Sequence, residues 1–135
     1  MSIKKIDHVG IVVHDIEAAL QVYRDALGLK LTKTESVPEQ EAKIAFLTVG
    51  ESEIELVQPT TSDGGIARYL AKRGEGIHHI CLEVDDIEAV LAQMAERGLE
   101  LINQSPRVGS GGQKYAFVHP KSAHGVLLEL YEKPK

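Results

Sequence analysis

The stretch "IDHVGIVVHDIEAAL" at residues 6–20 recurs as "IHHICLEVDDIEAVL" at residues 77–91, and this repetition decides the fold. The two copies align without a gap, so that His8 falls on His79. In each copy, an apolar run that predicts a strand leads into apolar residues at helical spacing. Because the same strand–helix unit occurs twice, the chain is expected to be an internal duplication.

The later part of each copy repeats as well. The segment "AFLTVGESEIELVQP" at residues 45–59 resembles "AFVHPKSAHGVLLELYE" at residues 116–132, with a few residues of insertion between them. Each half therefore reads as a strand, a helix and then several strands. The predicted bounds are about 4–59 for repeat one, about 63–74 for a linker helix and about 75–132 for repeat two.

The repeated helices have recognisable ends. Asp15 and Asp86 stand where N-cap residues belong, and Gly28 and Gly98 stand where a glycine commonly ends a helix. Tandem βαβββ units predict an α+β fold in which two strongly curved sheets form an open, barrel-like trough within one domain, 1–135. Such a trough is a natural place for a site built from both halves.

Bulk composition narrows the function classes. A length of 135 residues fits one compact domain, and the net charge of −5 argues mildly against a nucleic-acid partner, which requires a basic surface. The only cysteine is Cys81, so a disulfide within the chain is excluded. Without a signal-like or membrane-spanning stretch, we expect a cytoplasmic protein with no membrane contact.

Strand alternation places two histidines and two glutamates on the sheet faces opposite the apolar residues. Successive strand side chains point to opposite faces, so His8 and His79 point away from the apolar sets expected under the helices. Glu55 and Glu129 likewise lie opposite the apolar residues of their own strands. The apolar sets of the two histidine strands are Val9, Ile11 and Val13, and Ile80, Leu82 and Val84.

Two imidazoles and two carboxylates are a plausible ligand set for Zn, Co, Ni, Fe or Mn. A single strand histidine is usually structural or exposed, but here the same residue types recur at equivalent positions of both repeats. The duplication therefore favours a metal site. His78 is expected to be structural or to support a ligand, and Cys81 to be a small packing residue, since no base is evidently paired with it.

These features resemble the vicinal-oxygen-chelate superfamily over essentially the whole chain. Within it, four stretches resemble methylmalonyl-CoA epimerases: "IDHVGIVV", "PEQ", "GEGIHHICLEVDDI" and "GSGGQKYAFVHPKSAHGVLLEL". The resemblance implies that the metal ligands are His8, Glu55, His79 and Glu129. It also implies an acyl-CoA substrate whose C2 proton lies between a thioester carbonyl and a carboxylate.

The implied chemistry is inversion at C2 through an enolate that a divalent metal stabilises. Inversion needs a proton removed from one face and another delivered to the opposite face. By resemblance, Glu129 is one of these acid–base groups. The other family glutamate corresponds to Ile44, which cannot transfer a proton, so we expect Glu55 to serve on the second face.

The coenzyme A part of such a substrate needs cations and a groove. Lys114, Lys121, Gly111 and Gly112 are the candidate substrate-binding residues, within a wider set of cations at Lys72, Arg73 and Arg107. An ordinary solvated surface would carry the same lysines. The glycine-rich segment is either a lid over the substrate or a hairpin turn.

Two other functions fit the same pattern. The second ligand is often Gln in epimerases, and Glu55 moves the set toward the His/Glu/His/Glu pattern of bacterial glyoxalases, which isomerise thiol adducts. Against this, Gln58 and Pro59 follow Glu55 where glyoxalases carry another motif. A non-enzymatic binder of small molecules is the third interpretation, although such proteins usually lack the full ligand set. A homodimer is expected from the resemblance.

Overall fold

The computed structural model describes residues 2–135, which group into two compact units. Unit 2 is formed by His8–His78, and unit 1 by residues 2–7 together with 79–135. The first strand, β1 (Ile3–Val12), therefore begins in unit 1 and ends in unit 2. No helix in the described part of the chain is long and apolar enough to cross a membrane.

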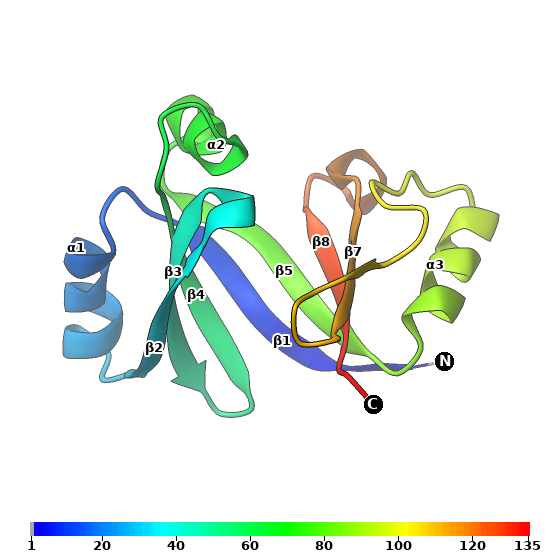
Figure 1. Ribbon diagram of the computed structural model, residues 1–135, viewed down its shortest axis with the longest axis horizontal. Helices are drawn as coiled ribbons and strands as arrows, with labels where there is room; N and C mark the ends of the chain where they lie inside the picture. The colour runs from blue at the N-terminus through cyan, green and yellow to red at the C-terminus, as the bar shows by residue number, and fades with distance from the viewer. Residues whose placement is uncertain (1) are drawn as a thin grey trace. The chain divides into compact units, whose positions relative to one another are not determined.

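In unit 2 the strands follow the order β2-β3-β4-β1, with β1 parallel to β4 and the other neighbours antiparallel. Figure 1 shows α1 on one side of this sheet. The further elements are α1 (Ile16–Leu20), a π-helix η1 (Gln21–Ala26), β2 (Lys30–Val37), a short turn η2 (Pro38–Gln40), β3 (Ala42–Val49), β4 (Ser52–Pro59) and α2 (Gly65–Arg73).

The helix-facing side of this sheet holds the first apolar core. Val13 and Ile11 of the predicted apolar set pack there with Ile16 and Leu20 of α1 and with Leu56 of β4. The opposite side carries a second cluster, which α2 covers with Leu70. That cluster consists of Val12, Ala42, Ile44, Val57 and Leu70.

In unit 1 the strands follow the order β5-β8-β7-β6, with β5 parallel to β8 and the other neighbours antiparallel. The elements are β5 (Gly76–Val84), which begins in unit 2, α3 (Ile87–Glu96), β6 (Arg107–Val108), β7 (Lys114–Val118), a short turn η3 (Pro120–Ala123) and β8 (Leu128–Glu132). Val84 and Leu82 pack under α3 with Val90, Leu91 and Leu130.

The N-terminal residues are hydrogen-bonded to Asp85, just after the end of β5, within unit 1. Ser2 donates its backbone N–H and its hydroxyl to the Asp85 carboxylate, at 2.8 and 2.9 Å. The Lys4 Nζ lies 4.0 Å from the Glu83 carboxylate. The two hydrogen bonds from Ser2 hold the pKa of Asp85 below its ordinary value.

The first residues of α1 and α3 are hydrogen-bonded to side chains on β4 and β8, the last strand of each repeat. The Gln58 side chain on β4 accepts a hydrogen bond of 2.8 Å from the backbone N–H of Ile16. In unit 1, the buried Glu132 on β8 accepts one of 2.9 Å from Ile87. These side chains satisfy backbone donors that a helix start leaves unpaired.

The predicted α+β fold of tandem βαβββ repeats is confirmed, as are the capping residues. The side chains of Asp15 and Asp86 accept hydrogen bonds from the first turns of α1 and α3. Gly28 and Gly98 have positive φ. Two features differ between the copies: η1 continues α1 as a π-helix, and β6 has two residues where β2 has eight.

Candidate metal and substrate site

Unit 2 holds the first of two buried histidine–glutamate pairs. The Nδ1 atom of His8 on β1 lies 3.3 Å from Oε2 of Glu55 on β4. In the parallel ladder Gly10 stands directly beside Glu55, so no side chain separates the carboxylate from His8, which precedes Gly10 on the same face. Both residues are more than nine-tenths buried.

Unit 1 holds the second pair in the same relation. The Nε2 atom of His79 on β5 lies 3.4 Å from Oε1 of Glu129 on β8. Here Cys81 takes the position of Gly10 beside the glutamate, and its thiol is fully buried, as expected for a packing residue. Each repeat therefore presents one imidazole and one carboxylate from two adjacent parallel strands.

The spacing within each pair fits a shared metal ion. Two ligand atoms about 2.0–2.2 Å from one ion, at tetrahedral or octahedral angles, stand about 3.0–3.5 Å apart. The observed separations of 3.3 and 3.4 Å lie in that range. Each pair supplies two ligands, and imidazole with carboxylate is the donor chemistry that Zn, Co, Ni, Fe and Mn accept.

A phenylalanine faces each glutamate from the neighbouring antiparallel strand. Phe46 on β3 is paired with Glu55, and Phe117 on β7 is paired with Glu129. These are the only two phenylalanines in the chain. The Phe117 ring also meets the His79 imidazole edge-on, with centroids 6.4 Å apart, so it restrains that ring and lowers the polarity around it.

The next row of side chains on the same faces differs between the units. In unit 2 this row is apolar, and Ile44 is 6% exposed beneath α2. In unit 1 the equivalent row is polar: Glu83 is paired with Tyr131, and Tyr131 with Tyr115. The repeated "AF" dipeptides place Tyr115 at the position of Ile44.

Glu83 is a buried carboxylate in this polar row. Its Oε1 atom lies 3.5 Å from Nζ of Lys133, and its Oε2 atom lies 4.0 Å from Nζ of Lys4. Within residues 2–135, Oε1 has no hydrogen-bond partner. The two lysines provide the positive charge that a buried carboxylate requires.

His78 belongs to a different environment from His79. Its ring packs edge-on against Tyr69 of α2, with centroids 4.6 Å apart, and burial lowers the pKa of the imidazole. The Tyr69 hydroxyl donates a hydrogen bond to the Ile77 carbonyl. These contacts agree with the structural role expected for His78.

The predicted substrate-binding residues are dispersed. Lys114 shares the helix-facing side of β7 with buried Ala116, and its Nζ donates a hydrogen bond of 2.9 Å to Glu88, which raises the pKa of Lys114. Lys121 lies in η3, where its backbone N–H bonds to the imidazole of His119. Neither lysine is placed beside Glu129 by these contacts.

The glycine-rich segment forms the hairpin turn between β6 and β7. Gly109 donates its N–H to the Gln113 carbonyl and Gly112 donates to the Gly109 carbonyl. The Gln113 side chain fills the loop and accepts a hydrogen bond from Gly111. A Cβ atom at Gly109 would lie 2.2 Å from Gln113 Nε2, so the Gln113 side chain would have to shift to admit a larger residue there.

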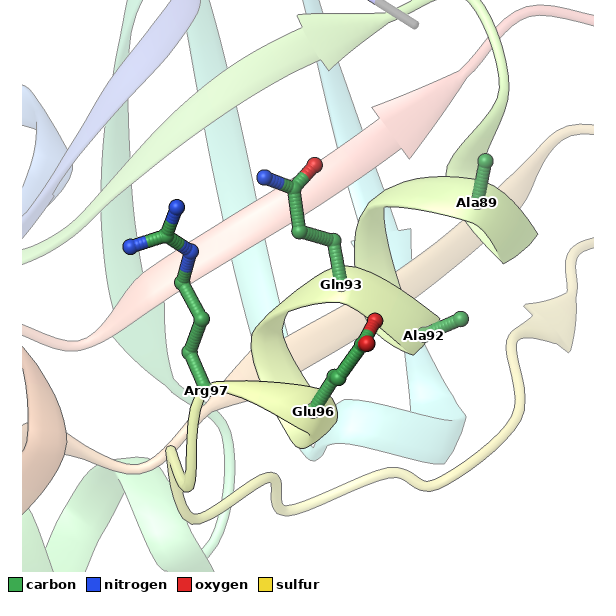
Figure 2. A pocket seen from close by; sticks show the side chains of 5 residues that line it. All are labelled: Ala89, Ala92, Gln93, Glu96 and Arg97. Carbon is green, nitrogen blue, oxygen red and sulfur yellow. The ribbon is translucent and has the colours of Figure 1, made fainter.

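Two other surface features of unit 1 involve α3. Figure 2 shows the five side chains that line a depression along α3. Near the start of α3, carboxylates of Asp86, Glu88 and Glu132 lie within 4.8 Å of one another. All three already accept hydrogen bonds, from α3 or from Lys114. The depression is lined by Ala89, Ala92, Gln93, Glu96 and Arg97.

Sequence reasoning missed Phe46, Phe117 and Tyr115. The repeated "AF" dipeptides were a usable signal for the phenylalanines, because these are the only two in the chain. Their position across from the glutamates depends on the ladder register, which the alternation of one strand does not reveal.

Comparisons with known proteins identify the family of this chain. A family model described as the Glyoxalase/Bleomycin resistance protein/Dioxygenase superfamily matches residues 7–117. An ethylmalonyl-CoA/methylmalonyl-CoA epimerase of Cereibacter sphaeroides is 37% identical over 95% of this chain and 97% of its own length.

Solved structures extend the comparison to the fold. A Streptomyces coelicolor methylmalonyl-CoA epimerase in complex with 2-nitronate-propionyl-CoA is 37% identical, with a TM-score of 0.89 over 98% of this chain and 96% of that one. A hypothetical protein of Bacillus halodurans C-125 is 46% identical, with a TM-score of 0.92 over 97% and 95% of the two chains.

Proposed function

Because this chain belongs to the Glyoxalase/Bleomycin resistance protein/Dioxygenase superfamily, and within it to the methylmalonyl-CoA epimerase family, we propose that it interconverts (2R)- and (2S)-methylmalonyl-CoA. The observation that carries the proposal is the matched pair of buried imidazole–carboxylate contacts, one in each repeat. The comparisons confirm the fold and the family resemblance expected from the sequence. The activity of the named relatives is assigned to this chain as a proposal.

We propose that His8, Glu55, His79 and Glu129 hold one divalent ion. A single His–Glu pair supplies two ligands, whereas a tetrahedral or octahedral protein site needs more, so sharing one ion completes the set.

A divalent ion held by these residues would supply Lewis-acid stabilisation of negative charge on the substrate oxygens. The protein side chains then need to move the C2 proton. We propose that Glu129 and Glu55 perform this step through their carboxylate oxygens. One removes the proton as the C–H electron pair enters the enolate, and the other protonates C2 from the opposite face.

The phenylalanines favour this chemistry. Phe46 and Phe117 stand beside the two carboxylates and reduce the water around them. A drier site strengthens the interactions that stabilise the enolate. Ile44 lies under α2 in an apolar cluster and has no transferable proton, which leaves Glu55 as the candidate on the unit 2 side.

The remaining assignments of the proposal concern the substrate arm and the assembly. Gly111, Gly112 and Lys121 are proposed to contact the acyl-CoA arm, while Lys114, held by Glu88, is the weaker candidate. The metal identity within Co, Zn, Ni, Mn and Fe, the homodimer and the cytoplasmic location stay predictions.

The test is proton exchange at C2. Metal-loaded protein is incubated with (2R)- or (2S)-methylmalonyl-CoA in deuterated water, and C2 is followed by NMR together with a chiral assay. Deuterium at C2 with loss of stereochemical purity, abolished by a chelator, is the expected result. Absence of both exchange and inversion from metal-loaded protein overturns the proposal.

A glyoxalase-type reaction is the second candidate, and Glu55 favours it. Two carboxylates in equivalent positions can move a proton between adjacent carbons of a thiol adduct through an enediolate. Methylglyoxal with a thiol is the probe for this activity. Formation of the 2-hydroxyacyl thioester without turnover of methylmalonyl-CoA would select this reaction over epimerisation.

A further inference from the structure

The two ligand faces are alike in their glutamates and unlike in the next row. Beside Glu55 the row contains Ile44, which α2 covers, whereas beside Glu129 the equivalent position is Tyr115, which is half-buried. A symmetric pair of carboxylates suits inversion, which treats both faces of C2 alike. The substrate itself is asymmetric, because a thioester and a carboxylate flank C2. A polar group that only one repeat carries, such as Tyr115, therefore matches an asymmetry of the substrate.

Tyr115 lies on the same face of the unit 1 sheet as Glu129. Phe117 is directly across from Glu129, and Tyr115 precedes it by two residues on β7, which makes Tyr115 a diagonal neighbour of the glutamate. Diagonal neighbours have Cβ atoms about 7–8 Å apart or less, a separation that a tyrosine can span. The Tyr115 and Phe117 rings meet edge-on with centroids 6.3 Å apart, a contact that restrains the Tyr115 ring.

The Tyr115 hydroxyl is available as a donor. Among residues 2–135 it has no hydrogen-bond partner, whereas the Tyr69 hydroxyl is bound to a backbone carbonyl. Tyr131, in the same row, already interacts with another group of the protein. A half-buried phenol on a ligand face usually finds a partner, and a substrate oxygen is the partner of matching chemistry.

We propose that Tyr115 donates a hydrogen bond to the substrate oxygen that gains negative charge when the C2 proton leaves. The inference rests on the proposed epimerase function and deepens it. Glu55 or Glu129 takes the C2 proton, the C–H electron pair moves onto the oxygen, and the phenol keeps its own proton throughout. The bond strengthens as charge develops, so it lowers the barrier more than it tightens binding.

The experiment compares Tyr115→Phe with Tyr23→Phe. The first variant removes only the hydroxyl and keeps the ring contact with Phe117. The second removes a phenol that packs on the helix side of unit 2, away from the ligand face. Both are loaded with the same divalent metal, and metal content, epimerisation and C2 deuterium exchange are measured for each epimer.

For Tyr115→Phe we expect exchange and inversion to fall together, by about 10²-fold in kcat, as for loss of one oxyanion donor, with metal content and KM little changed. Tyr23→Phe should match the wild type. Wild-type rates in Tyr115→Phe overturn the inference. So does exchange that persists for one epimer while inversion is lost, because Tyr115 would then be a proton carrier for one face.

These outcomes are separable from failure of the proposed function. If wild-type protein neither exchanges nor inverts methylmalonyl-CoA, the epimerase proposal fails before the variants are compared. If the wild type is active and both tyrosine variants are equally active, the epimerase proposal stands and the role of Tyr115 is rejected.

Discussion

The Glu132 carboxylate at the end of β8 accepts a hydrogen bond from the Ile87 N–H at the start of α3, just as Gln58 accepts one from Ile16 in the other repeat. Each of these side chains lies three residues beyond a site glutamate on the same strand. The hydrogen bond therefore ties the strand that carries Glu55 or Glu129 to the helix packed behind it.

The first prediction concerns this connection. Glu132→Gln keeps an acceptor oxygen, as Gln58 has in repeat one, and should change the free energy of unfolding little. Glu132→Ala leaves the Ile87 N–H unpaired in a buried place and should cost about 1–3 kcal/mol. Urea unfolding of the two variants checks this. Equal destabilisation by both would show that the charge, and not the hydrogen bond, matters.

The second prediction concerns proton transfer. Glu55→Gln keeps an oxygen ligand for the metal but cannot accept a proton, so metal content should persist while epimerisation falls by about 10²–10⁴-fold. Metal analysis and the C2 exchange assay are run on the same sample. Full activity in this variant would exclude Glu55 as the second acid–base group.

The third prediction concerns metal stoichiometry. Four ligands on one ion predict one divalent ion per chain by elemental analysis, and its loss on substitution of either His8 or His79 by Ala. Metal at one hundred times its dissociation constant should stabilise the fold by about 2.7 kcal/mol. Thermal unfolding with and without a chelator measures this shift. Two ions per chain, or binding that survives in both histidine variants, contradicts a shared site.

The fourth prediction concerns pH. Because hydrogen bonds from Ser2 lower the pKa of Asp85 in the folded state, the folded protein holds the Asp85 proton less tightly than the unfolded chain. The resulting stability is present above the unfolded pKa, near 3.8, and is lost as the pH falls through the lower folded value. Asp85→Asn removes the charge at every pH. The stability difference between wild type and variant, measured by urea unfolding, should therefore shrink below about pH 4.

Much of the fold could be predicted because its signals are local. Alternation on one strand was enough to separate His8 from Ile11 and Val13, and the helix ends at Asp15 and Gly28 follow from backbone chemistry. The duplication then extended each inference to the second half.

The rest of the site depended on contacts between strands. Phe117 becomes a neighbour of Glu129 only through the register of β7 with β8. Lys114 belongs to the helix-facing side because Tyr115 and Phe117 occupy the other, and its partner Glu88 is distant in sequence. Inspection of the glycines alone could not distinguish a lid from the turn that Gln113 fills.

The division of β1 between the two units has a consequence for synthesis on the ribosome. Unit 2 is one continuous segment, His8–His78, so all of its residues are translated before those of β5 that unit 1 requires. Residues 2–7 are made before unit 2, yet Ser2 must wait for Asp85, 83 positions later, before it acquires its native partner. Because domains fold as their chains are completed, the nascent protein should fold from the middle outward. Residues 2–7 are then incorporated only after unit 2, which follows them in the chain, has folded.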